Sequence, residues 1–160
     1  MAIFLRRLFG IGKLPREMRE QFDSEGIIYL AEYVAVTRRF TGKVPGHRAS
    51  GSFASYVGSL VFTSQRAVAT LSTVPKIAGR TMDVRWNDPQ QGAVKAEISS
   101  SGVSLAADIA AVDPKFSGQL SLTYKVDIPE DVLNRLPTRQ LAFDVPPEYV
   151  YRAVGVPHNP

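Results

Sequence analysis

One stretch of the sequence, residues 53–73, constrains the fold more than any other. Along residues 57–63, Val57, Ser59, Val61 and Thr63 alternate with Gly58, Leu60 and Phe62. Three polar residues follow, and residues 67–71 are again apolar and partly β-branched. Two such runs separated by a short polar segment are typical of a β-hairpin. Because both runs are largely apolar, the sequence predicts that this hairpin lies in the middle of a sheet.

The composition limits the class of protein. At 160 residues the chain is long enough to bury a core as one domain. Its hydrophobic content of 44% and its charged content of 21% are those of a globular protein rather than a disordered one. The chain has no cysteine, which excludes disulfides, a thiol nucleophile and Cys-ligated metal centres.

Positive charge is concentrated near the start of the chain. The net charge is +4, and this excess lies within residues 1–50, because the remaining residues hold equal numbers of acidic and basic side chains. A basic end on a neutral body predicts an anionic partner, such as a membrane surface or an acidic protein face. The alternative is a solvated basic surface that only keeps the protein soluble.

Residues 1–14 form a basic segment with an amphipathic pattern. A secretory signal peptide is disfavoured because arginines interrupt the apolar run early and no small-residue cleavage site follows. The pattern fits a short helix in a membrane interface, and the alternative is a segment that covers an open end of the domain or packs on a partner subunit. The predicted membrane contacts are Phe4, Leu5, Arg6, Arg7, Leu8 and Phe9.

The rest of the chain is predicted to be mainly β, as one domain over residues 15–145 followed by an irregular Pro-rich tail, residues 146–160. Helices are expected early, at residues 15–22, and late, at residues 129–136. Residues 41–52 and 73–80 are rich in Gly and Pro and are expected to be connections. Besides the hairpin, strands are expected at residues 27–40, 82–86, 93–98, 103–110, 119–127 and 140–145.

An early helix, a long strand, a basic connection and the hairpin sequence GSLVFTSQR at residues 58–66 together resemble the start of the pleckstrin-homology-like (PH-like) superfold, especially its GRAM and bacterial PH-like members. The resemblance covers roughly residues 14–136. It implies a PH-like antiparallel β-barrel or sandwich of about seven strands that acts as an interaction module without enzymatic activity.

The chain departs from this family at its late helix, which is only about two turns long where the family usually closes the barrel with a longer one. A lipocalin-like barrel that binds a small ligand, or an enzyme with an apolar cavity, is therefore the alternative. The cavity walls would come from Tyr29, Tyr33, Phe62 and Trp86.

The basic connection is the candidate site. Its side chains are expected to converge on a phosphate or carboxylate, with glycine backbone N–H groups assisting; the alternative is a flexible basic surface loop. The candidate anion-binding residues are Arg38, Arg39, Lys43, His47 and Arg48.

No catalytic set, cofactor site or metal site is predicted. His47 lies among basic residues and could serve as a base, but no nucleophile or acid is spaced to act with it. We therefore expect a cytoplasmic protein, peripheral at an anionic membrane or bound to a partner protein. Nucleic acid is disfavoured because few aromatic residues accompany the basic ones, and strand edges allow a homo-oligomer.

Overall fold

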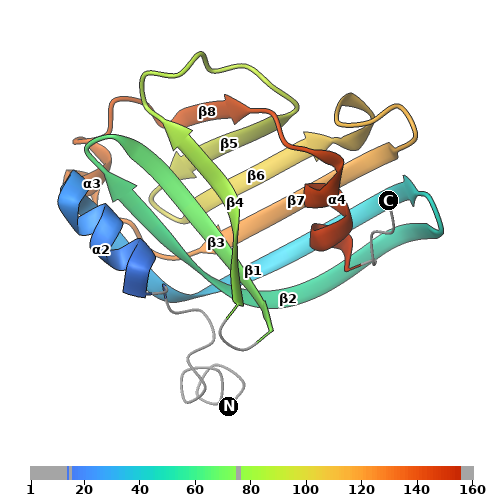
Figure 1. Cartoon of the computed structure of the whole chain (residues 1–160), viewed down its shortest axis with the longest axis horizontal. Coiled ribbons are helices and arrows are strands. Elements are labelled where there is room, and N and C mark those ends of the chain that lie inside the picture. The colour runs from blue at the N-terminus through green and yellow to red at the C-terminus, as the bar shows by residue number, and fades with distance from the viewer. Residues whose placement is uncertain (1–13, 15, 75–76, 156–160) are drawn as a thin grey trace.

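The structure, a computed structural model, describes residues 14, 16–74 and 77–155. It confirms a mainly β, antiparallel, barrel-like fold with an early helix and a short late helix (Figure 1). The sheet has eight strands, close to the seven expected. The proposed membrane contacts Phe4, Leu5, Arg6, Arg7, Leu8 and Phe9 lie outside the described residues.

Most of the described elements are strands. In chain order they are α2 (Arg16–Glu25), β1 (Ile27–Val44), β2 (His47–Thr63), β3 (Arg66–Val74), β4 (Ile77–Arg85), β5 (Val94–Ser99), β6 (Gly102–Asp108), the 3-10 helix η1 (Ile109–Ala111), β7 (Ser117–Lys125), α3 (Glu130–Leu133), β8 (Gln140–Phe143) and α4 (Pro147–Val154).

The strands form one sheet in the order β4-β3-β2-β1-β7-β6-β5-β8. β1 pairs with β2 on one side and with β7 on the other, and so joins the two halves of the sheet. The edge strands of the sheet, β4 and β8, face each other across an opening of about 280 Å³. The β4–β5 connection bridges this opening, because the Ala142 N–H donates to Gln90 Oε1 at 3.0 Å. The barrel is therefore nearly closed.

The predicted central hairpin is formed by β2 and β3 around a turn at Ser64 and Gln65. Residues 57–63 are all buried, because both faces of this part of β2 are covered. The inner face lies in the barrel core, and on the outer face Val61 and Val68 pack with Phe22 of α2. The absence of a clean polar alternation in this stretch follows from this double burial.

A buried ion pair holds α2 against the sheet. Arg66 Nη2 donates to Glu25 Oε2 at 2.5 Å, and Arg66 Nη1 donates to Asp83 at 3.2 Å. The side chains of Arg66 and Glu25 are each only 8% exposed. Burial alone raises the pKa of Glu25, but hydrogen bonds from Arg66 and Thr63, together with the Arg66 charge, outweigh burial, and the pKa lies below its ordinary value of 4.5.

A chain of hydroxyl groups crosses the barrel interior. The fully buried Tyr124 of β7 donates from its OH to the Thr70 carbonyl at 2.8 Å, and the same OH lies 2.5 Å from Thr81 Oγ1. Tyr149 of α4 donates to the Thr81 carbonyl at 2.8 Å. Burial raises the pKa of both phenols, which keeps them protonated and able to donate. These bonds tie β7 and α4 to β3 and β4.

The expected connections at residues 41–52 and 73–80 are wrong. Residues 41–44 continue β1, and β2 begins at His47 after a two-residue turn of Pro45 and Gly46, in which Gly46 has a φ of 81°. Gly42 is a glycine because a Cβ there would lie 2.1 Å from the Ser117 carbonyl oxygen of β7. Similarly, β3 extends to Val74 and β4 begins at Ile77.

The expected irregular tail is also wrong over residues 147–154, which form α4. Pro147 stands in the first turn of this helix, where a missing N–H is tolerated, and Gly155 ends it with a φ of 76°. Val150, Ala153 and Val154 are buried against the barrel core. Pro146 and Pro147 therefore precede and begin a helix instead of making this part of the tail irregular.

Substitution of Glu25 by Gln tests the buried ion pair. We expect the free energy of unfolding at neutral pH to fall by about 2–4 kcal/mol, because Arg66 then keeps a buried charge without its full partner. The folded-state pKa of Glu25 is lowered, so its contribution is present above the ordinary value of 4.5 and is lost as the pH falls through the folded-state pKa.

Urea denaturation across the acid range measures both effects. The stability difference between the wild type and Glu25→Gln should shrink as the pH falls below 4.5. The exposed control Glu97→Gln should change stability by less than about 0.5 kcal/mol. A difference that stays constant through the acid range would contradict the assignment.

Candidate functional site

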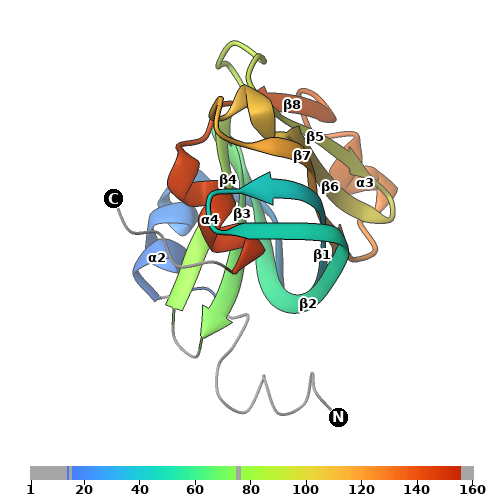
Figure 2. The ribbon, with the colours of Figure 1, turned by 90° about the vertical axis from the view of Figure 1, so that its right-hand side faces the viewer.

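The β1–β2 hairpin carries all five candidate anion-binding residues. Both strands are long, 18 and 17 residues, and their outer parts extend beyond β3 to the turn at Pro45 and Gly46 (Figures 1 and 2). Side chains alternate between the inner and outer faces of this hairpin. The five residues therefore do not converge on one point, and the strand period divides them into two groups.

Three of the five candidate residues lie on what we call the outer face of the hairpin, defined by Arg39, Lys43, Arg48 and Phe53. Lys43 and Arg48 are opposite each other in the ladder, and Arg39 is opposite Phe53. The Arg39 guanidinium carbon lies 5.7 Å from the centre of the Phe53 ring. The two rungs are about 13 Å apart along the strand, from four residues at about 3.3 Å each.

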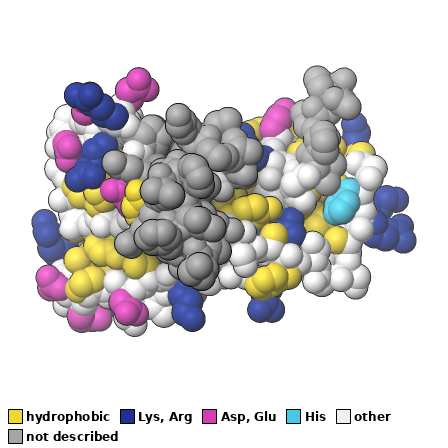
Figure 3. All heavy atoms as spheres, turned by 90° about the horizontal axis from the view of Figure 1, so that it is seen from below, with side chains coloured by type: hydrophobic (Ala, Val, Ile, Leu, Met, Phe, Trp, Pro, Cys, Tyr) yellow, Lys and Arg dark blue, Asp and Glu magenta, His cyan; other side chains and the backbone are white. Residues whose placement is uncertain are grey.

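The cations of the outer face are exposed and lack acidic partners. Among the described residues, no Asp or Glu lies within ion-pairing distance of Arg39, Lys43 or Arg48. Phe53 is 59% exposed and is the one exposed large hydrophobic side chain in the described part of the chain. In Figure 3, basic side chains gather beside the histidine at one end of the molecule. This face combines positive charge with an accessible aromatic ring.

Arg38 points the other way, into the protein, and is only 5% exposed. Its Nη2 donates to Ser52 Oγ at 2.8 Å and its Nη1 donates to the Ala153 carbonyl at 3.3 Å, near the end of α4. A cation at a helix C-terminus stabilises the helix dipole and its unpaired carbonyls. Arg38 therefore positions α4 against the hairpin and is not part of an exposed anion site.

His47 also lies on the inner face. It is half-buried, and its ring stacks on Phe40 with centres 6.3 Å apart. His47 thus contributes an aromatic contact at the start of β2, apart from the exposed cations.

The aromatic residues proposed as cavity walls pack against one another. The Phe62 ring lies 5.7 Å from that of Tyr29 and 6.2 Å from that of Trp86, centre to centre. Trp86 also donates from Nε1 to the Thr63 carbonyl at 2.8 Å. Tyr33 lies at an irregularity of β1 with a φ of 59°. A void near Leu105, Leu122 and Tyr149 measures about 10 Å³, room for no more than a water molecule.

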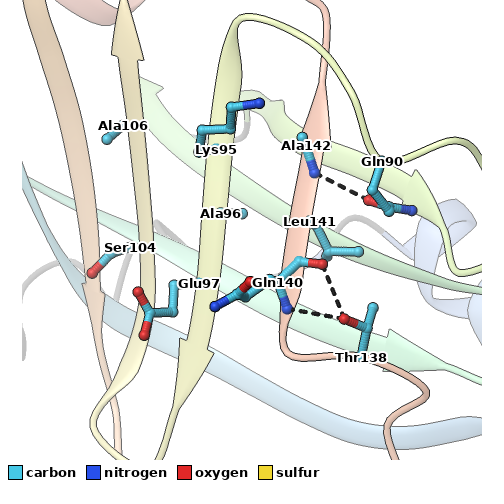
Figure 4. Close-up of a pocket in the computed structure, with 10 residues that line it drawn as sticks. All are labelled: Gln90, Lys95, Ala96, Glu97, Ser104, Ala106, Thr138, Gln140, Leu141 and Ala142. Atoms are coloured by element: carbon cyan, nitrogen blue, oxygen red, sulfur yellow. Dashed lines mark hydrogen bonds between the residues drawn. The ribbon is translucent and has the colours of Figure 1, made fainter.

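A groove of about 640 Å³ lies on the outer side of β5, β6 and β8 (Figure 4). Ala106, Lys95 and Ala142 form one rung across these strands, and the two small side chains leave space beside the lysine. The next rung adds Glu97 between a serine and a glutamine. The lining offers one ammonium, one carboxylate and neutral hydrogen-bonding groups, without a histidine. It indicates no particular reaction.

No family model, curated protein or solved structure that was compared with the chain matches it. Within residues 14, 16–74 and 77–155, no three His, Asp or Glu side chains are grouped as a metal site would need. The helices in this same part of the chain are too short or too polar to cross a membrane.

One signal in the sequence indicates the outer face more clearly than the glycine-rich composition of residues 41–52. The chain contains no Asp or Glu between Glu32 and Asp83. The basic side chains of the hairpin therefore have no acidic neighbour in β1 after Glu32 and none in β2. Phe53, which the sequence assigns to a strand but not to a site, completes the outer face because it lies opposite Arg39.

Two neighbouring arginines test the division into inner and outer faces. Arg38→Met should lower the free energy of unfolding by about 1–3 kcal/mol, because the half-buried Ser52 hydroxyl and the end of α4 lose their donor. Arg39→Met should change it by less than about 0.5 kcal/mol. Thermal and urea denaturation measure both variants. Equal effects, or a larger effect for Arg39→Met, would contradict the observed orientation.

Proposed function

We propose that this protein is a non-enzymatic, PH-like interaction module that binds an anionic partner, a membrane surface or a protein, through the outer face of the hairpin. One observation carries the proposal: three exposed cations without acidic partners lie beside the exposed Phe53 ring. Cations attract and orient an anionic surface, and an exposed ring adds apolar contact.

The expected affinity is modest. Three basic side chains near an anionic surface supply roughly 3 kcal/mol, at about 1 kcal/mol each. Burial of one Phe ring adds about 1.5–3 kcal/mol. The total of roughly 5 kcal/mol corresponds to a dissociation constant in the range of hundreds of micromolar. Binding through this face alone is therefore reversible and sensitive to salt.

The filled core favours this proposal over a ligand-binding barrel. A ligand-binding barrel needs an internal cavity, whereas the described core is filled by side chains such as Tyr124, Phe40 and Phe62. Attachment to a membrane or to a protein uses the same outer face. Cytoplasmic location, peripheral membrane attachment and self-association through strand edges belong to the proposal as further expectations.

The test compares two triple variants with the same change of charge. One carries Arg39→Ser, Lys43→Ser and Arg48→Ser on the outer face. The control carries Lys125→Ser, Arg135→Ser and Arg139→Ser, at exposed positions away from the turn of the hairpin. The probes are phosphatidylserine-containing vesicles, for co-sedimentation, and poly-glutamate, for fluorescence anisotropy.

We expect the wild type to bind at least one probe at low salt. The outer-face variant should bind about 100-fold more weakly, the factor that corresponds to roughly 3 kcal/mol. The control variant should stay within about threefold of the wild type, because surface charges elsewhere contribute little. Absence of binding to both probes, or an equal loss in the control, would contradict the proposal.

A further inference from the structure

β2 pairs with β1 on one side and with β3 on its second side, and it extends beyond the end of the β3 ladder. It pairs with β1 from His47 to Thr63, but with β3 only from Val57 to Phe62. Among the described residues, no strand pairs with the second side of β2 along residues 47–56. Figure 1 shows this part of β2 at the border of the sheet, after β3 has diverged from it. The border is an open strand edge within the sheet order, additional to β4 and β8.

The free backbone groups of this edge can be assigned. β2 and β3 meet at a two-residue turn, so Thr63 and the other odd-numbered residues of β2 bond to β3. This alternation is unbroken between residues 52 and 62 of β2. The two register irregularities of the ladder in this stretch place their extra residues in β1 and not in β2. The N–H and C=O groups of Phe53 and Ser55 therefore point to the side that lacks a strand.

The straight part of the edge is short and unprotected. The register of the β1–β2 ladder shifts between Phe40 and Gly42, where β2 has an extra residue. Beyond this bulge, the edge is regular from residue 52 to residue 56. These five residues span about 17 Å, at about 3.4 Å per residue. They include no proline and no charged side chain, the two devices that most often block an open edge. The edge is therefore able to accept one more strand.

Charge decides which strand fits. A strand added beside residues 52–56 would place its outward side chains next to Phe53 and two strand spacings, about 10 Å, from the β1 position of Arg39. Two copies of this chain would bring Arg39, Lys43 and Arg48 near their own counterparts, and residues 33–82 include no acid to compensate them. A second copy is thus disfavoured, and an acidic segment from another protein is favoured.

We propose that residues 52–56 of β2 bind an extended acidic segment of a partner protein as an additional strand. Backbone hydrogen bonds to Phe53 and Ser55 supply a sequence-independent part of the affinity, and acidic side chains on the outward side of the segment meet Arg39, Lys43 and Arg48. The inference rests on the proposed function and names the partner as a protein segment rather than a membrane.

The experiment uses the full chain and a seven-residue peptide that alternates glutamate with threonine and valine, capped at both ends. A second peptide of the same sequence is N-methylated at alternate residues, which removes backbone donors without changing its charge. Ser55→Pro removes a donor of β2 that pairs with no strand in the described part of the chain, and Ser55→Ala keeps that donor. Circular dichroism and thermal denaturation establish that Ser55→Pro folds like the wild type.

We expect the N-methylated peptide to bind the wild type at least tenfold more weakly than the unmodified one. Ser55→Pro should weaken the unmodified peptide by a similar factor, Ser55→Ala should stay within twofold of the wild type, and binding of phosphatidylserine vesicles should not respond to Ser55→Pro. If methylation and Ser55→Pro have no effect while the outer-face triple variant abolishes binding, strand addition is overturned and the proposed function stands. If the outer-face triple variant still binds both the peptide and the vesicles, strand addition and the proposed function are both overturned.

Discussion

The fold depends on the two ladders of β1. This strand pairs with β2 along nearly its whole length and with β7 from Ala35 to Lys43, and so connects hairpins that are distant in the sequence. Pairing of this range is non-local, and it holds only if side chains on both faces agree with one register. The Tyr124 hydroxyl strengthens that register from inside, because it bonds across the barrel to β3 and β4.

The same ladder creates the candidate site. Because β1 and β2 are longer than β3, their outer parts project as a hairpin with one border open. The strand period then sends Arg38 inward to hold α4, and Arg39 outward beside Phe53. Adjacent arginines thus have unrelated tasks, structural for the first and, in our proposal, recognition for the second. α4 supports the inner side of the hairpin while the outer side remains exposed.

Residue patterns predicted much of this architecture. The hairpin around Ser64, the early helix, the late helix and the strand at residues 140–143 follow from periodicity and helix signals that act locally. The strands within residues 41–52 were not predictable in this way. Gly42 is needed for a close approach to β7, which is distant in the sequence, and without that contact its glycine is typical of a flexible loop. α4 was missed because its prolines lie before and in the first helical turn. The types of residue at the site were predictable, but their division between two faces required the register.

The central claim is that β2 has an open edge on the projecting hairpin, and amide hydrogen exchange followed by NMR tests it most directly. In the free protein, the amides of Ala54 and Tyr56 bond to β1 because the bonds of β2 alternate between its two sides. Those of Phe53 and Ser55 have no partner among the described strands. The account predicts that Phe53 and Ser55 exchange at least about tenfold faster than Ala54 and Tyr56. Equal, strong protection of all four amides would show that the edge is covered, and would contradict the account.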